Sequence, residues 1–378
     1  MKKIVAFWKK ETVLCVAVLL GVISSFLVRP DAAYLEYIDF RTLAILFCLM
    51  SIMAGLQKQG VFRLIAESLI KRVHGLRQIQ LILVLLCFVL SMFITNDVAL
   101  ITLVPFTLTV LGKLGEEWKK KLAVPIVVMQ TMAANLGSML TPIGNPQNLY
   151  LYGKSGIGLG EFLLLMLPYS LASLAMMVIW CLVHQPESDG PTSLFFAFRS
   201  DSEFVGNKKH ILAYVALFLL GLLTVGHMVP YLLTLSIVTL VILFMDRDVF
   251  GRVDYSLLIT FVGFFVFIGN IGRMEIFRTF LESVVNGFEV PVGILSSQII
   301  SNVPAALLLS EFTKDVQSLI VGVNLGGLGT LIASMASLIS YKQIVKEMPE
   351  EKGTYFKRFT WTGIAFLAVL ILIWWMIR

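Results

Sequence analysis

The chain has 378 residues, of which 58% are hydrophobic and 14% are charged, and this composition leaves too much apolar surface for a single water-soluble core. The sequence therefore predicts an integral membrane protein that contacts the lipid bilayer. Its net charge of +6 requires no nucleic-acid partner, because membrane proteins place Lys and Arg on the cytoplasmic side.

Apolar segments recur along the whole chain after a lysine-rich start. Residues 1–30 lack a small-residue cleavage site and are predicted to form an uncleaved N-terminal transmembrane helix. A helix needs ~20 residues to cross a bilayer. Apolar segments of comparable length lie at 12–28, 41–57, 79–94, 98–111, 122–152, 161–184, 211–226, 229–245, 255–272, 291–310, 316–341 and 359–377.

Two of these regions are predicted to enter the membrane and return on the same side. Only 21 residues separate Glu289 from Glu311, whereas two full crossings need roughly 40 residues, so the hairpin 291–312 must turn inside the membrane at Ser301-Asn302. The region 79–111 turns at Thr95-Asn96-Asp97. Its length also fits an ordinary tilted hairpin, and only the internal symmetry of the chain favours a re-entrant one.

The most polar intramembrane run extends from Asn135 to Asn148, inside the apolar segment 122–152. Two prolines remove backbone donors, two glycines weaken the helix, and Asn, Gln and Thr side chains bring polar groups to bilayer depth. Opened backbone is tolerated there only where it is buried in protein or lines a wet cavity. The run is therefore predicted to be the unwound middle of a discontinuous helix and half of a binding site.

The two halves of the chain repeat each other. Asp39, Arg63 and Glu67 reappear 215 residues later as Asp254, Arg278 and Glu282, Thr95-Asn96 is echoed by Ser301-Asn302, and Asn135, Gly137 and Thr141 are echoed by Asn324, Gly326 and Thr330. The predicted organisation is an N-terminal helix (1–30), a first repeat (31–184, with hairpin 79–111 and broken helix 122–152), a cytoplasmic linker (185–210), a helical pair (211–245) and a second repeat (246–378, with hairpin 291–312 and broken helix 316–341).

The distribution of Lys and Arg orients the chain. With the N-terminus in the cytoplasm and both hairpins returning to their own side, 23 of the 30 Lys and Arg residues lie inside and 7 lie outside, in agreement with the positive-inside rule. This topology has about nine crossings, an external C-terminus and two inverted halves. We expect it to lie in a bacterial cytoplasmic (inner) membrane.

Four polar elements are expected to meet at the midplane, namely two hairpin tips and two helix breaks. Freed helix ends there expose N–H groups that favour anions and C=O groups that favour cations, so the site suits a small anion beside Na+. For a single Asn or Ser, interhelical hydrogen bonding is the alternative. The predicted binding residues are Thr95, Asn96, Asp97, Asn135, Gly137, Thr141, Gly144, Asn145, Asn148, Ser301, Asn302, Asn324, Gly326, Thr330 and Ser334.

Asp97 is the only acidic residue deep in an otherwise uncharged span. A carboxylate in a low-dielectric environment needs a cation, a partner or a proton, so Asp97 is predicted to bind the coupling cation or to carry a proton. The alternative is a hairpin tip in a water-filled vestibule. The four histidines and four cysteines show no metal-ligand spacing and no P-loop motif occurs, which disfavours an enzyme or an ATP-driven pump. No cofactor is expected other than Na+ or H+ as the coupling ion.

These motifs resemble the ion transporter superfamily, which includes divalent anion:sodium symporters, citrate transporters, arsenite permeases and one group of Na+/H+ antiporters. The resemblance covers nearly the whole chain, and it is carried by residues 93–100, 135–148, 301–305 and 326–337. It implies two inverted halves, usually in a homodimer with elevator-like movement. It also implies Na+ and substrate binding at the hairpin tips and broken-helix loops, with Na+ held by Thr95, Asn96, Asn135, Ser301, Asn302 and Asn324.

Two features depart from the symporter branch. Asp97 stands where that branch has a Thr after the Asn, and the second helix break lacks a Thr-Pro-Pro-Asn-like run; both features are more similar to the arsenite permeases. We therefore expect an all-α polytopic membrane protein that transports a small anion with Na+ or H+. The alternatives are cation/proton antiport, with Asp97 as the exchanger, and an arsenite-type permease.

Overall fold

The computed structural model describes residue 8 and residues 11–72, 75–184 and 206–378. Every regular element in these ranges is a helix and none is a strand, so the predicted all-α fold is confirmed. The predicted linker 185–210 lies outside the described residues except for its last five positions.

The first half of the chain contains α2 (Thr12–Leu27), α3 (Tyr34–Tyr37), α4 (Phe40–Lys58), α5 (Val61–Ile70), α6 (Leu76–Ile94), α7 (Asn96–Lys113), α8 (Glu116–Ser138), α9 (Pro146–Ser155) and α10 (Leu159–Val183). The second half contains α12 (Lys208–Val225), α13 (Tyr231–Asp246), η1 (Arg247–Arg252), α14 (Tyr255–Gly272), α15 (Glu275–Val285), α16 (Glu289–Ile300), α17 (Asn302–Ser310), α18 (Val316–Leu325), α19 (Met335–Glu347), η2 (Pro349–Glu351) and α20 (Lys352–Ile377).

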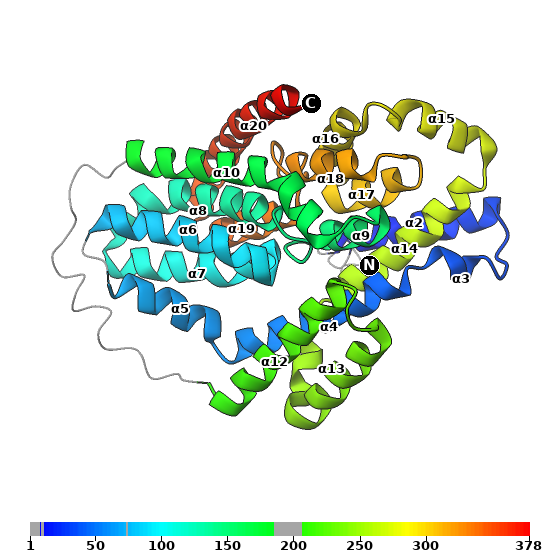
Figure 1. The fold of residues 1–378 in the computed structure, drawn as a ribbon. Helices are drawn as coiled ribbons and strands as arrows, with labels where there is room; N and C mark the ends of the chain where they lie inside the picture. The colour runs from blue at the N-terminus through cyan, green and yellow to red at the C-terminus, as the bar shows by residue number, and fades with distance from the viewer. Residues whose placement is uncertain (1–7, 9–10, 73–74, 185–205) are drawn as a thin grey trace.

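The helices form a bundle with an appended helical pair (Figure 1). Helices α6, α7, α8 and α10 run side by side, and α19 and α20 pack against α8. Helices α12 and α13 pack on α4 at the edge of the molecule. Helix α2 lies along α14, where a Cβ on Gly263 would come within 2.9 Å of the Ala17 backbone. Small residues at such a crossing let two apolar helices approach closely without a side chain between them.

Seven described helices are long and apolar enough to cross a membrane, or up to eight if the bent pair α15–α16 counts as one span. The sequence predicts about nine crossings. Helices α2 and α18 have 16 and 10 residues and fall short of a full crossing, whereas α6 and α7, the arms of the first predicted hairpin, have 19 and 18. The arms of the second hairpin, α16 and α17, have only 12 and 9 residues. The nine-crossing topology thus stays a prediction.

Both halves begin with the same local structure. The Asp39 carboxylate accepts a hydrogen bond from the Thr42 amide at 2.9 Å and caps α4, and Asp254 caps α14 through the Leu257 amide at 3.1 Å. Such side-chain acceptors satisfy one of the free donors at a helix start. The repeat-related pairs Arg63–Glu67 and Arg278–Glu282 are joined at 2.7 and 2.8 Å, as their four-residue spacing predicts.

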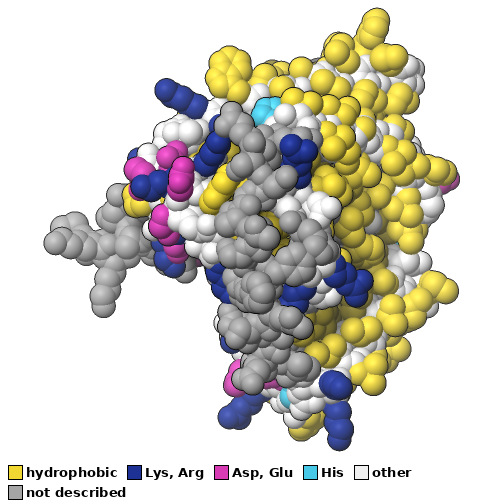
Figure 2. All heavy atoms as spheres, turned by 90° about the vertical axis from the view of Figure 1, so that its left-hand side faces the viewer, with side chains coloured by type: hydrophobic (Ala, Val, Ile, Leu, Met, Phe, Trp, Pro, Cys, Tyr) yellow, Lys and Arg dark blue, Asp and Glu magenta, His cyan; other side chains and the backbone are white. Residues whose placement is uncertain are grey.

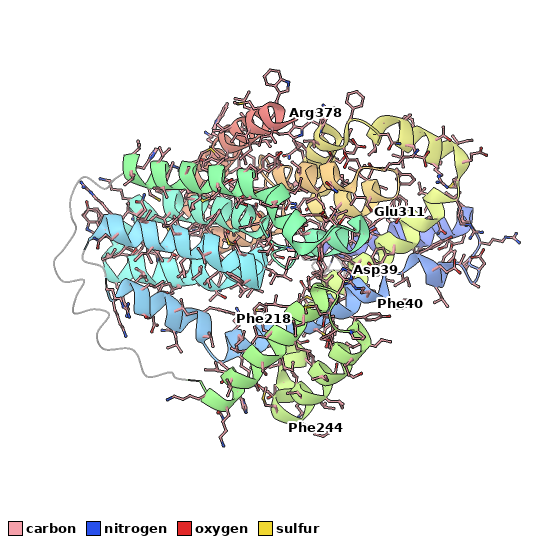
Figure 3. The ribbon with its side chains drawn as sticks, in the orientation of Figure 1. Asp39, Phe40, Phe218, Phe244, Glu311 and Arg378 are labelled. Carbon is pink, nitrogen blue, oxygen red and sulfur yellow. The ribbon has the colours of Figure 1, made fainter. Side chains whose placement is uncertain are left out.

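Large apolar side chains cover much of the outer surface. Phe244 and Ile276 are 84% and 85% exposed, and Figure 3 shows Phe244 pointing away from the molecule at the edge formed by α12 and α13. In the end-on view of Figure 2, a broad hydrophobic surface lies beside a region where Lys and Arg side chains gather. This arrangement fits an integral membrane protein, whose apolar surface contacts lipid instead of water.

Candidate functional site

Each hairpin turns at a single residue with an unusual backbone conformation. Thr95 joins α6 to α7 with φ 69° and ψ 149°, and Ser301 joins α16 to α17 with φ 74° and ψ 154°. Non-glycine residues rarely adopt positive φ, and such strain persists only where surrounding contacts enforce it. The residue after each turn makes one backbone hydrogen bond to the broken helix: the Asn96 amide donates to the Gly144 carbonyl at 3.1 Å, and the Asn302 amide donates to the Ala333 carbonyl at 2.9 Å.

Each hairpin tip therefore docks onto the broken helix of its own half. Helix α8 ends at Ser138 and α9 begins at Pro146, while α18 ends at Leu325 and α19 begins at Met335. Gly144 and Ala333 immediately precede Asn145 and Ser334, which occupy the N-cap positions of α9 and α19. The two helix breaks predicted from the sequence are present.

Glycines let the broken helices approach the hairpins. A Cβ on Gly137 would lie 2.1 Å from the Phe88 carbonyl oxygen of α6, and a Cβ on Gly326 would lie 2.6 Å from the Ser297 hydroxyl of α16. Both contacts are far inside van der Waals distance, so any larger residue would separate the helices. The predicted site glycines act here by allowing close packing.

The last turn of α8 is tied to the second half of the chain. The Asn135 Oδ1 accepts bonds from Ser334 Oγ at 2.9 Å and from Asn96 Nδ2 at 3.2 Å, and its Nδ2 donates to Ser337 Oγ at 3.1 Å. Asn135 thus joins its own hairpin tip to the first turn of α19.

The last turn of α18 makes the reciprocal connection to the first half. The Asn324 Nδ2 donates to Asn148 Oδ1 at 2.6 Å, and its Oδ1 accepts from Asn145 Nδ2 at 3.2 Å. The partners of Asn324 follow Asn135 by 10 and 13 residues, and the serine partners of Asn135 follow Asn324 by the same intervals. The two halves therefore exchange matching contacts.

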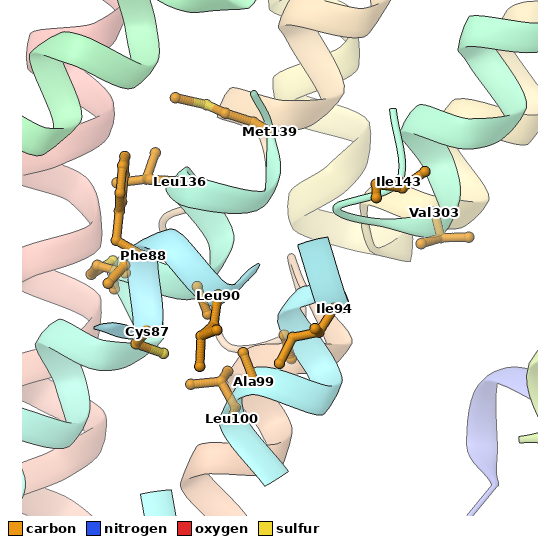
Figure 4. Close-up of a cluster of buried hydrophobic side chains, with 14 of the residues drawn as sticks. Cys87, Phe88, Leu90, Ile94, Ala99, Leu100, Leu136, Met139, Ile143 and Val303 are labelled. Carbon is orange, nitrogen blue, oxygen red and sulfur yellow. The ribbon is translucent and has the colours of Figure 1, made fainter. Parts of the chain in front are cut away.

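These amides are buried and fully engaged. Asn135, Asn145, Asn148 and Asn324 are each at most 6% exposed. An unpaired buried polar group costs about 1–3 kcal/mol, so the network stabilises one specific arrangement of the two halves. Figure 4 shows the apolar surroundings of the first hairpin tip, where Ile94, Leu136 and Met139 are among the packed side chains.

A cavity of about 140 Å³ lies on the other side of the first hairpin tip, between α4, α7, α9 and α14. Thr95, Asp97 and Asn145 line it together with Arg252 and Asp254. Asp97 lies in the first turn of α7, where the helix dipole favours a negative charge. Within the described part of the chain its carboxylate has no ion-pair partner.

The predicted residues thus divide into groups. Asn96, Asn135, Asn145, Asn148, Asn324 and Ser334 form the hydrogen-bonded network, and Thr95, Asp97 and Asn145 face the cavity. Ser301 and Asn302 are buried at the second tip. The side chains of Thr141 and Thr330 bond outside the network: Thr141 Oγ1 donates to the Met92 carbonyl at 2.5 Å, and Thr330 Oγ1 donates to the Gln298 carbonyl at 3.5 Å.

Gln298 is a residue that the sequence reasoning missed. Its Nε2 donates to the Gly326 and Leu328 carbonyls at 2.8 and 2.9 Å, which satisfies the opened backbone of the second break. Asn148 does the same in the first break, where its Nδ2 donates to the Thr141 carbonyl at 3.2 Å. A lone Gln three residues before a hairpin tip was the available signal.

The arrangement offers two kinds of chemistry. In the network the amide oxygens already accept bonds from protein donors, so a cation there would compete with those donors. In the cavity, the carboxylates of Asp97 and Asp254 and the hydroxyl of Thr95 are hard oxygen ligands, which suit a small cation or a proton. Arg252 adds one positive charge at the cavity lining for an anion.

Helix α9 is held at its far end by the second hairpin. The Tyr150 hydroxyl lies 3.0 Å from Ser310 Oγ, and Lys154 forms an ion pair with Glu311, which Figure 3 labels. Arg41, near the start of α4, lies 3.3 Å from the His227 ring in the turn between α12 and α13. Partial burial and the Arg41 charge lower the pKa of His227 from its ordinary value, which favours the neutral ring.

Comparison with known proteins finds similarity along most of the chain. A family model described as "Citrate transporter" matches residues 4–319. An uncharacterized transporter of Methanocaldococcus jannaschii is 33% identical over 305 residues, 81% of each chain. The inner membrane protein YbiR of Escherichia coli is 29% identical over 332 residues, 86% of each chain. A silicon efflux transporter of Oryza sativa subsp. japonica is 32% identical over 165 residues, 43% of this chain and 33% of that protein.

Proposed function

Because this chain belongs to the citrate transporter family of membrane transporters, we propose that it is a secondary active transporter that moves a small anion across the cytoplasmic membrane, coupled to Na+ or H+. The network of four buried asparagines between two broken helices carries this proposal. Broken helices from two halves meeting over buried polar groups are how many secondary transporters build one site that opens alternately to either side.

The reciprocal contacts support alternating access in a specific way. The first segment of each broken helix carries an asparagine in its last turn, Asn135 or Asn324, whose side chain bonds the start of the other half's second helix segment. A shift of one half relative to the other therefore acts on both sets of bonds at once. Two arrangements related by this symmetry would have equivalent bonds between the halves and therefore similar energies, and they would expose the site to opposite sides in turn.

The cavity beside Asp97 supports cation coupling. Its carboxylate is half-buried and lines the same cavity as the exposed Asp254. The repulsion between two neighbouring carboxylates is relieved when a cation or a proton binds. We propose that this coupling ion neutralises Asp97 while the anion binds near the helix ends of the two breaks, whose N–H groups favour negative charge.

We propose that the N-terminus is cytoplasmic and the C-terminus external, in the inner membrane of a bacterium. The Lys and Arg asymmetry of the sequence supports this orientation.

The second candidate function is cation/proton antiport or an arsenite-type permease. The Asp97–Asp254 cavity favours the first, because a pair of carboxylates can exchange a cation for a proton without any anion. The rice relative is named as a silicon efflux transporter, so a small oxyacid is also a reasonable substrate class.

Flux into proteoliposomes distinguishes these functions. The purified chain is reconstituted and given an inward Na+ gradient or an inward proton gradient, with labelled carboxylates, sulfate, phosphate, arsenite and silicate in turn. Anion uptake above that of protein-free liposomes, driven by one of the two gradients, is the expected result. Gradient-driven cation exchange with no anion uptake would support antiport instead.

A further inference from the structure

A second cavity, of about 250 Å³, lies between α5 and α7 and is separate from the site described above. Helix α5 presents Phe62, Ala66 and Ile70 to the core, because these residues are spaced by one helical turn and are all buried. The adjacent stripe lines the cavity; it consists of Arg63 and Glu67 of this helix and of Lys71, which directly follows the helix.

The rim of this cavity is basic. Arg63, Lys71 and Lys113 contribute three positive charges against the one negative charge of Glu67, which Arg63 contacts at 2.7 Å. Two threonines also line the cavity, but their hydroxyl protons are engaged by backbone carbonyls: Thr102 donates to Val98 and Thr109 donates to Pro105. The cationic side chains therefore supply the attraction, which favours an anion.

The floor of the cavity is apolar and belongs to α7. Pro105, Phe106 and Val110 form it, and helix α7 is long and apolar enough to span the membrane. Lys113, one of the cationic lining residues, is the last residue of this helix. A cavity with charge at the helix end and apolar surface along the helix fits an amphiphile better than a free ion.

We propose that this cavity binds the phosphate headgroup of an anionic phospholipid of the cytoplasmic leaflet, with an acyl chain against Pro105 and Phe106. Basic pockets between helices on the cytoplasmic side of a membrane suit acidic lipid headgroups. The lipid would hold α5 against α7, the second arm of the first hairpin. This role is independent of which substrate the transporter carries.

The test uses the purified full chain in a neutral detergent, titrated with dioleoylphosphatidylglycerol, with dioleoylphosphatidylcholine or with inorganic phosphate. The melting temperature, followed by tryptophan fluorescence, gives an apparent affinity for each. We expect phosphatidylglycerol to raise the melting temperature and the other two to have little effect. In Lys71→Gln/Lys113→Gln we expect the affinity for phosphatidylglycerol to fall about fivefold for each lysine removed.

The matched control is Arg72→Gln/Lys120→Gln, which removes the same charge from exposed positions that do not line the cavity. It should bind phosphatidylglycerol as the parent does. If the double variant fails to fold, the single variant Lys71→Gln is titrated in its place. Equal weakening in the cavity and control variants would overturn the proposal, because binding would then follow overall charge. Stabilisation by inorganic phosphate equal to that by phosphatidylglycerol would overturn the lipid as the ligand.

Discussion

Replacing Asp97 with Asn is the most informative change in the proposed site. The substitution keeps the size of the side chain and removes its charge from the cavity that it shares with Thr95 and Asp254. The fold should persist, because the carboxylate has no ion-pair partner in the described ranges and an acid in the first turn of a helix contributes only about 0.3–1 kcal/mol.

Coupling should suffer much more than stability. If Asp97 binds Na+, the lost contact is a charged one worth about 1.5–3 kcal/mol, which corresponds to a decrease of roughly 10- to 150-fold in apparent Na+ affinity. If Asp97 carries a proton, flux should instead lose its dependence on pH while any Na+ dependence is unchanged. Proteoliposome uptake measured over a range of Na+ concentrations and of pH distinguishes the two cases.

The matched control for this experiment is Asp315→Asn. Asp315 is exposed and caps α18 through the Ser318 amide at 2.9 Å, and Asn caps a helix about as well, so Na+ and pH dependence should stay as in the parent. Wild-type flux with unchanged Na+ and pH dependence in Asp97→Asn would refute the reasoning. Asp97 would then be a solvated vestibule residue, and binding would rest on the asparagine network.

Two further predictions concern the hairpins. Cysteines placed at the exposed positions Phe288 and Lys314 should react with a membrane-impermeant thiol reagent from the same, external side, because hydrogen bonds join the two ends of the second hairpin. Reaction from opposite sides would show that α16 and α17 cross the membrane. Gly137→Ala should lower the free energy of unfolding by about 1–3 kcal/mol or more, because the new Cβ would lie 2.1 Å from the Phe88 carbonyl oxygen. The control Gly160→Ala, whose Cβ would have no atom within 4 Å, should not lower it. Equal melting temperatures for the two variants would contradict the close packing of α6 and α8.

Residue patterns predicted the parts of the site that depend on local sequence. Prolines and glycines in an apolar segment mark a broken helix, because they interrupt backbone hydrogen bonding in any environment. A Thr-Asn or Ser-Asn pair between two short apolar segments marked each turn. The ends of the helices at Ser138, Pro146, Leu325 and Met335 follow from these signals.

The partners across the two halves could not be predicted in the same way. That Asn135 would meet Ser334 and Ser337, and not the corresponding asparagines, depends on how the halves dock in space. Helix α6 begins at Leu76, three residues before the apolar segment 79–94, because the polar side chains of Arg77 and Gln78 are compatible with a helix end. Hydropathy alone does not predict such extensions.

The central claim is that the chain couples transport of a small anion to a cation gradient. The most direct measurement is uptake of the labelled anion panel by proteoliposomes that contain the purified chain, with Na+ or H+ imposed on one side only. We predict uptake against the anion's own gradient that requires one of the two cations and stops when that cation gradient is collapsed. Anion movement that only equilibrates and ignores both gradients would contradict the claim, because it would describe a channel instead of a coupled transporter.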